Sequence, residues 1–265
     1  MPDRAGPGGR PPQTPAAPLA TSQRVLVAVA HGSADPRASA TIAELAAVAR
    51  GRRPGLDLRT AFLGHAPPSL PQVLSTMEAG REVTVLPLLL TAAYHSKADI
   101  PRLLARFPRL RVGYGATLGP HPLLLRALER HLAEADPQGV RADPKRTAVV
   151  LAAAGSSDQE ANATIARLAA QWQAGTGWLA VRPAYASAAE PSPAAAVTGL
   201  LRDGAPRVVV ATYLLAPGWF ADRIRQSTLA AGAAAVSAAL GACAEVADVL
   251  LDRSAEAASQ RRAAA

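Results

Sequence analysis

An internal repeat constrains this chain more than any other feature of its sequence. The segment 32-GSADPRASATIAELA-46 matches 155-GSSDQEANATIARLA-169 at ten of fifteen positions, with an offset of 123 residues (155 − 32 = 123). The same offset aligns 61-AFLGHAPPS-69 with 184-AYASAAEPS-192, which share a Pro-Ser pair. Shared turn residues at matched spacing are typical of duplicated structural units. We therefore expect two similar halves.

Within each half, short apolar runs alternate with helical patterns. The run 24-RVLVAVA-30 predicts a buried strand, and 35-DPRASATIAELAAVAR-50 predicts a helix that Asp35 caps and Pro36 begins. Four such strand–helix units follow one another up to residue 135. Nearly continuous apolar strands between helices predict parallel sheets covered on both faces. The expected fold class is α/β, with two similar domains of flavodoxin or Rossmann type and an interdomain cleft.

Composition changes suggest where the domains begin and end. Residues 1–23 are rich in Pro, Ala and Gly and lack the apolar core of a signal peptide, so we expect a disordered tail. We expect a first domain over 24–140 that carries the active site, and a degenerate repeat over 141–253. Residues 254–265 are expected to form a flexible tail. No apolar run is long enough to predict a membrane span.

Cysteine content and charge narrow the function classes. The one cysteine, Cys243, excludes an intramolecular disulfide and a CxxC zinc site, and is typical of a cytoplasmic protein. The net charge is +8, but the basic residues are dispersed and no aromatic residues interleave with them. That pattern disfavours nucleic-acid binding. A polyanionic small-molecule ligand and a solvated basic surface both remain open.

Three histidines follow three successive predicted strands. His31 follows the first strand, His65 the second and His95 the third. Ligands of open parallel sheets bind beyond the carboxyl ends of the strands, so we expect these side chains at one edge. The second half has no histidine at the aligned positions, which are Ala154, Ala188 and Phe220. Loss of the histidines from an otherwise similar repeat favours one working site in the first half.

These histidines suggest a weak, open metal site. Imidazole binds divalent transition metals and titrates near neutrality. The alternative for His31 and His95 is a structural hydrogen bond within a loop, and His65 is equally compatible with a supporting or a surface position. His121 precedes a predicted helix and is interpreted as structural, whereas His131 is predicted on the surface.

Several other residues are candidates for binding an anion. Gly32 and Ser33 precede a predicted helix, whose first backbone N–H groups could bind one. Basic side chains near the expected cleft could bind carboxylates or phosphates, and the alternative for each is a solvated helix end. They are Lys97, Arg102, Arg223 and Arg225.

Two motifs resemble the sirohydrochlorin chelatase family, the class II tetrapyrrole chelatases. One is the His31-Gly32-Ser33 turn, and the other is Tyr94-His95 leading into Asp99-Ile100-Pro101. The run 215-LAPGWFADRI-224 resembles the two-domain form of the family. The resemblance covers roughly residues 24–250. It implies two α/β domains and ATP-independent insertion of a divalent metal, without an organic cofactor, into a sirohydrochlorin-like tetrapyrrole.

The resemblance also implies roles for residues. His31 and His95 are expected to bind the metal and to be catalytic, with His65 as a further metal ligand where family members often carry an acidic residue. Co²⁺ would indicate cobalamin synthesis and Fe²⁺ siroheme synthesis, with Ni²⁺ as a further candidate metal. We expect a monomer or homodimer. The residues expected to bind the tetrapyrrole are Ser33, Tyr94, Lys97 and Arg223.

Two other functions remain open from the sequence. A non-catalytic protein that binds or delivers metal or tetrapyrrole needs the same histidines. A phosphoryl-transfer enzyme with His31 as nucleophile needs arginines close to the Gly32-Ser33 turn, and Arg37 is the one nearby candidate.

Overall fold

The structure, a computed structural model, describes residues 24–92, 95–137, 139 and 143–263. The predicted tail over 1–23 lies outside the described residues, as do Tyr94 and the side chain of His95.

The helices and strands follow the predicted alternation in both halves. The first half contains β1 (Val25–Ala30), α1 (Pro36–Arg52), β2 (Asp57–Phe62), α2 (Leu70–Ser75), β3 (Glu82–Pro87), the π-helix η1 (His95–Asp99), α3 (Ile100–Leu104), β4 (Arg111–Tyr114) and α4 (Pro122–Ala135). The second half contains the 3₁₀ turn η2 (Pro144–Arg146), β5 (Thr147–Ala153), α5 (Gln159–Gly175), β6 (Ala180–Tyr185), α6 (Pro193–Arg202), β7 (Arg207–Tyr213), α7 (Trp219–Ala230), β8 (Ala235–Val236) and α8 (Ala244–Ala263).

Each half builds its own four-stranded parallel sheet, and the two strand orders correspond. The first sheet runs β2-β1-β3-β4 and the second β6-β5-β7-β8. In the first sheet, Val25 lies opposite Asp57 on one side and Val83 on the other. One inner strand of each sheet, β1 in the first and β5 in the second, is buried along its whole length. The predicted α/β fold with two similar parallel sheets is confirmed.

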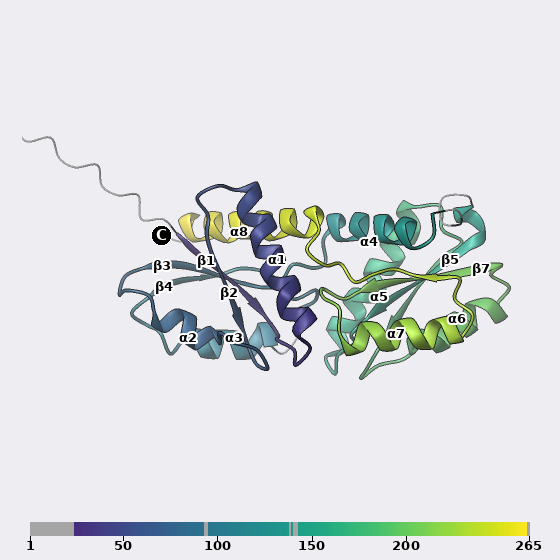
Figure 1. Cartoon of the computed structure of the whole chain (residues 1–265), viewed down its shortest axis with the longest axis horizontal. Helices are drawn as coiled ribbons and strands as arrows, with labels where there is room; N and C mark the ends of the chain where they lie inside the picture. Colours follow the sequence, from purple (N-terminus) through teal and green to yellow (C-terminus); the bar gives the residue numbers. More distant parts are fainter. Residues whose placement is uncertain (1–23, 93–94, 138, 140–142, 264–265) are drawn as a thin grey trace, which may run out of the picture.

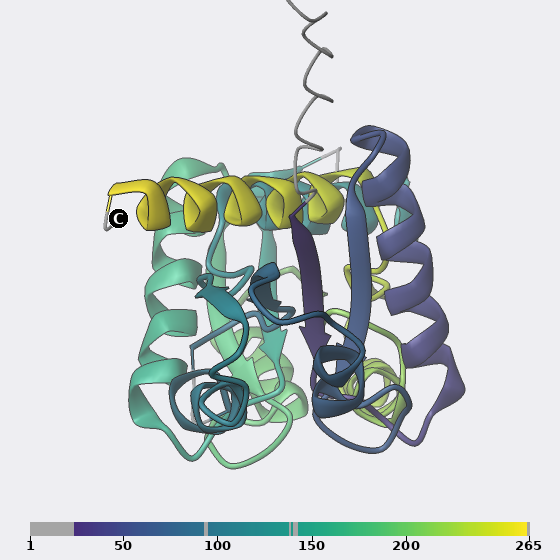
Figure 2. The same cartoon turned by 90° about the vertical axis from the view of Figure 1, so that its left-hand side faces the viewer.

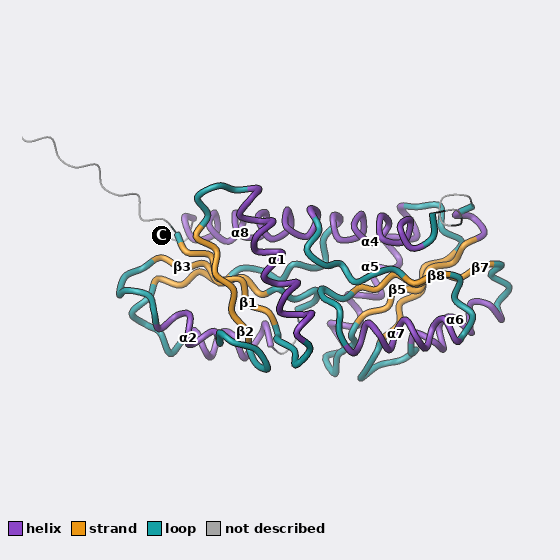
Figure 3. Tube along the Cα trace, viewed as in Figure 1, coloured by secondary structure: helices purple, strands orange, loops and turns teal. Residues whose placement is uncertain are grey.

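Helices cover both faces of each sheet (Figures 1 and 3). Alternate residues of β1 face opposite cores, as the two-residue period of a strand requires. Leu26 belongs to a large core that continues from one sheet to the other and includes α1, α4, α5 and α8. Val27 belongs to a smaller core with α2 and α3, and the second sheet has a separate core with α6 and α7. One face of the molecule therefore has a core shared by both halves.

The last helix of each half lies over the sheet of the other half. Helix α4 packs against β7 and β8, whereas α8 packs against α1, β3 and β4. Figure 2 shows α8, in yellow, crossing the top of the first sheet. The domain boundary expected at residue 140 stays a prediction. Helix α4, which precedes that residue in the chain, packs on the sheet of the second half.

The prediction of a flexible tail over 254–265 is wrong for the described part of that segment. Helix α8 continues to Ala263, and Ser254 and Ala257 are buried in it. Alanine has the highest helix propensity, and the small side chains fit against the first sheet. Arg261 also donates a hydrogen bond to the Arg111 carbonyl at 2.8 Å. Among the described residues, no helix has the length and apolarity to cross a membrane.

Candidate functional site

The turn after β1 is pressed against the turn after β2. The backbone N–H of Gly64 donates to the His31 carbonyl at 3.1 Å. Gly32 has φ +91, and a Cβ atom there would collide with the Gly64 carbonyl. Glycine is needed at this position for two reasons, the backbone conformation and the close approach. The crowded turn fixes where the His31 side chain leaves the sheet edge.

His65 lies beside His31, as predicted from their positions after adjacent strands. The two ring centroids are 6.4 Å apart and the rings are tilted by 52°. His65 has a positive φ of 62, and its counterpart Ala188 has φ 57. Because both halves share this unusual backbone, it belongs to the scaffold, whereas the imidazole is particular to the first half. Both histidine side chains are exposed.

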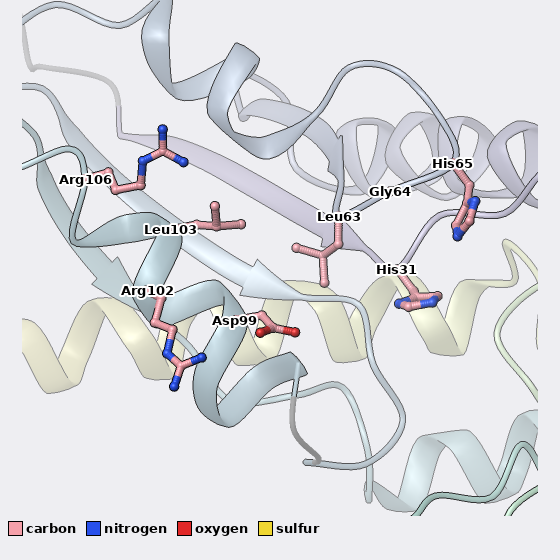
Figure 4. A pocket seen from close by; sticks show the side chains of 8 residues that line it. All are labelled: His31, Leu63, Gly64, His65, Asp99, Arg102, Leu103 and Arg106. Atoms are coloured by element: carbon pink, nitrogen blue, oxygen red, sulfur yellow. The ribbon is translucent and has the colours of Figure 1, made fainter.

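These two histidines form one end of a pocket of about 510 Å³. All the lining residues come from the first half: His31, Leu63, Gly64, His65, Asp99, Arg102, Leu103 and Arg106 (Figure 4). The sequence predicted a cleft between the two domains. Because this pocket is lined by one half alone, that cleft stays a prediction. The volume lies within the range of small-molecule sites.

The η1–α3 segment and the turn after it supply half of the pocket lining. Asp99, Arg102, Leu103 and Arg106 have the i, i+3, i+4, i+7 spacing of one helix face, although α3 ends at Leu104, before Arg106. The sequence-based site left out Asp99 and Arg106, and gave Arg102 only as a basic residue near the cleft. That spacing, directly after the Tyr94-His95 motif, is the signal that could have found all four.

His95 begins the η1 segment, so its backbone is close to the pocket-lining Asp99 in the chain. Tyr114 of β4 holds this segment by donating a hydrogen bond to the Ser96 carbonyl at 2.8 Å. Burial raises the pKa of Tyr114 to about 12, so the hydroxyl keeps its proton at neutral pH. The expected pairing of the His31 and His95 side chains stays a prediction, because the His95 side chain lies outside the described residues.

The other predicted tetrapyrrole-binding residues already have partners within the chain. The Ser33 hydroxyl accepts a hydrogen bond from the Asp35 backbone at 3.0 Å. Lys97 donates to the Asp158 carboxylate at 2.7 Å. Arg223 lies over the exposed Trp219 ring, 5.1 Å from its centroid.

Two ion pairs join the loops at the carboxyl ends of the two sheets. Arg37 at the start of α1 contacts Asp222 of α7 at 2.6 Å. In the second pair, Lys97 of η1 contacts Asp158, which caps α5, at 2.7 Å. The base thus lies at the start of the first helix of its half in one pair, and the acid does so in the other. Arg37 also donates to Asp35, which lowers the pKa of that carboxyl. The Lys97 ammonium likewise lowers the pKa of Asp158. Both pairs cross between the halves.

The two remaining histidines belong to α4. His121 caps this helix by accepting a hydrogen bond from the Leu123 backbone at 3.2 Å, so its structural interpretation is confirmed. The surface prediction for His131 is wrong, because its side chain is only 12% exposed. His131 lies seven positions after Leu124 and three after Leu128, so it belongs to the buried face of this helix.

Few side chains in the described part of the site could bind a metal ion. Within the described part of the chain, no cluster of three or more His, Cys, Asp or Glu side chains has the spacing of a metal site. His31 and His65 therefore form an open pair of nitrogen donors. Such a pair is suited to transient contact with a metal ion rather than to permanent storage.

Comparisons with known proteins agree with the repeat. The model of the CbiX family matches residues 25–135 and again residues 148–257, once in each half. A sirohydrochlorin cobaltochelatase from Priestia megaterium is 26% identical over 75% of this chain, and the match spans 66% of that relative's length. A sirohydrochlorin ferrochelatase from Bacillus subtilis (strain 168) is 25% identical over 77% of this chain and 78% of its own.

A solved structure has a similar fold. SirB from Bacillus subtilis with Fe³⁺ superimposes with a TM-score of 0.76, at 22% identity, over 91% of this chain and 98% of that one. The family match covers most of the chain in two copies, which is the arrangement that the repeat predicts. The resemblance noted from the motifs is thus confirmed, and the chain belongs to the CbiX family of sirohydrochlorin chelatases.

Proposed function

We propose that this protein inserts a divalent metal, Co²⁺ or Fe²⁺, into sirohydrochlorin. The observation that carries the proposal is the pocket at the carboxyl ends of β1 and β2, where His31 and His65 lie with ring centroids 6.4 Å apart. The curated relatives are a cobaltochelatase and a ferrochelatase that act on this tetrapyrrole. Ni²⁺ is a further candidate, because imidazole accepts all three metals.

The chemistry requires a metal to enter the macrocycle while two pyrrole protons leave. A neutral imidazole can bind the incoming metal and can also accept a proton near neutral pH. We assign His31 and His95 to these two roles. His65 supplies a third nitrogen where relatives often have a carboxylate, and its ring lies close enough to His31 for both to contact one ion in turn. No organic cofactor is required for this step.

The second half supplies a wall for the site rather than a second centre. Its turn carries Ala154 and Ala188 where the first half has histidines. Trp219 and Phe220, at the mirrored position of His95, pack edge to face with centroids 5.0 Å apart and are 61% and 37% exposed. Such an aromatic pair can cover an apolar macrocycle.

The phosphoryl-transfer alternative is disfavoured by the position of Arg37. That guanidinium is engaged by Asp35 and Asp222, so it neutralises protein carboxylates instead of facing an incoming phosphate. The delivery-protein alternative needs the same histidines and differs from the chelatase only in turnover.

Multiple turnover separates these two functions. Sirohydrochlorin in tenfold excess over the protein would be mixed anaerobically with Co²⁺, Fe²⁺ or Ni²⁺, and the absorbance of the metallated product followed. The proposal predicts more than one product molecule per protein, formed faster than in protein-free buffer. Rates equal to the buffer control for all three metals would contradict it and favour delivery. The fastest metal would indicate whether the protein serves cobalamin or siroheme synthesis.

A further inference from the structure

The pocket has a basic end as well as a histidine end. Figure 4 shows Arg102 and Arg106 on the side away from the two imidazoles, with Leu63 and Leu103 between the two ends. Arg102 lies on α3, and Arg106 lies four positions later in the turn that follows this helix. The pocket therefore offers nitrogen donors at one end and two guanidinium groups at the other, with two leucines and the Asp99 carboxylate between them.

Arg106 differs from Lys97 and Arg37 because no acidic side chain among the described residues pairs with it. Lys97 is paired with Asp158, and Arg37 with two carboxylates. Within the part of the chain that the structure describes, no ion pair or side-chain hydrogen bond engages Arg106, and its side chain is exposed. Its planar fork of donors matches the geometry of a carboxylate.

The basic end is particular to the working half. The alignment that places His95 opposite Phe220 also places Arg102 opposite Ser227 and Arg106 opposite Ala231. The pocket lining carries one carboxylate, Asp99, against two guanidinium groups, so one positive charge is in excess. The second half thus lacks the arginines where it also lacks the histidines.

From this arrangement we infer that Arg102 and Arg106 bind peripheral carboxylates of the tetrapyrrole. Pairing at that end lays the macrocycle over Leu63 and Leu103 and brings its centre toward the histidines. The arginines select tetrapyrroles with acidic side chains over neutral or cationic rings. The inference rests on the proposed function for the identity of the ligand, and on the pocket for the binding mode.

The test is direct binding of a metal-free probe that requires no turnover. Uroporphyrin, an octacarboxylate porphyrin, would be titrated into wild type, Arg102→Gln, Arg106→Gln and the double variant, with fluorescence as the readout. Arg202→Gln is the matched control, because Arg202 lies on α6 with its side chain 81% exposed. Each exposed guanidinium–carboxylate pair should be worth a few-fold in Kd, so the double variant should raise Kd by about tenfold. The control should change Kd less than twofold.

A cationic porphyrin, the tetrakis(N-methylpyridinium) compound, tests charge selection with a similar ring. The inference predicts weaker binding to wild type than uroporphyrin, and no loss of affinity in the double variant. Equal uroporphyrin affinity in wild type and the double variant would overturn it, as would an equal loss for both porphyrins.

Metal insertion into sirohydrochlorin then separates this inference from the proposed function. Arg106→Gln should raise KM several-fold with kcat nearly unchanged, because the guanidinium acts on binding and not at the ring centre. Arginine-dependent uroporphyrin binding without any insertion by wild type would support the inference and contradict the chelatase. Insertion by wild type with arginine-independent binding would contradict the inference alone.

Discussion

Gly32→Ala should be among the most destabilising single changes at any turn of the first sheet. The position has φ +91, where an alanine costs about 1–2 kcal/mol. The added Cβ would also collide with the Gly64 carbonyl, and relief of such crowding costs about 1–3 kcal/mol more. We expect the free energy of unfolding to fall by about 3 kcal/mol.

Two other glycines separate the backbone cost from the crowding cost in this loss of stability. Gly55 has φ +80 but open space around its missing side chain, so Gly55→Ala should cost only the backbone term, about 1 kcal/mol. Gly155 has φ +83, and a Cβ there would collide with the Ser187 carbonyl, so Gly155→Ala should match Gly32→Ala in stability. Of these two variants, only Gly32→Ala should lose metal insertion at temperatures where both are folded, because only that turn carries the His31 imidazole.

Equilibrium urea unfolding, followed by circular dichroism, measures all three variants. The reasoning is refuted if Gly32→Ala and Gly55→Ala reduce stability equally, since the crowding would then have no cost. It is also refuted if Gly155→Ala abolishes insertion in the folded protein as strongly as Gly32→Ala does.

Two predictions concern ion pairs. Arg130 lowers the pKa of Glu245 to about 2, below its unfolded value, so the pair stabilises the fold at neutral pH and loses this effect as pH falls from about 4.5 toward 2. Glu245→Gln should therefore cost about 1–2 kcal/mol at pH 7 and less at pH 3, by urea unfolding, and a pH-independent difference would contradict this. Lys97 lowers the pKa of Asp158, so Lys97→Gln should raise that carboxyl's titration midpoint in ¹³C NMR. An unchanged midpoint would show that the pair between the halves is absent in solution.

The repeat made the two sheets predictable, but not the exchange of helices between them. Leu124 and Leu128 of α4 have the spacing of a buried helix face whichever sheet they cover. Sequence spacing therefore could not show that α4 packs on the second sheet and α8 on the first. The same exchange explains why the segment 254–265 was predicted to be flexible, because the helix that contains most of it packs on the first sheet.

The sequence predicted where the site lies in the fold better than it predicted which side chains contact one another there. His31 and His65 follow adjacent parallel strands, and topology alone brings such residues together. Lys97 gave no sequence signal for its pairing with Asp158, because the two are 61 positions apart and meet only when the halves dock. Arg106 carried a usable signal, its helical spacing from Asp99.

The most direct test of the account is the initial rate of anaerobic Co²⁺ insertion into sirohydrochlorin by wild type and His31→Ala. The second half already has alanine at this place, Ala154, in an equivalent turn where its carbonyl accepts from Ser187 at 3.0 Å. The variant should therefore keep its fold, which circular dichroism would check. The account predicts a loss of about 100-fold or more, the contribution of a positioned metal-binding and proton-accepting group. A rate within about threefold of wild type would contradict the assignment of His31 to the reaction.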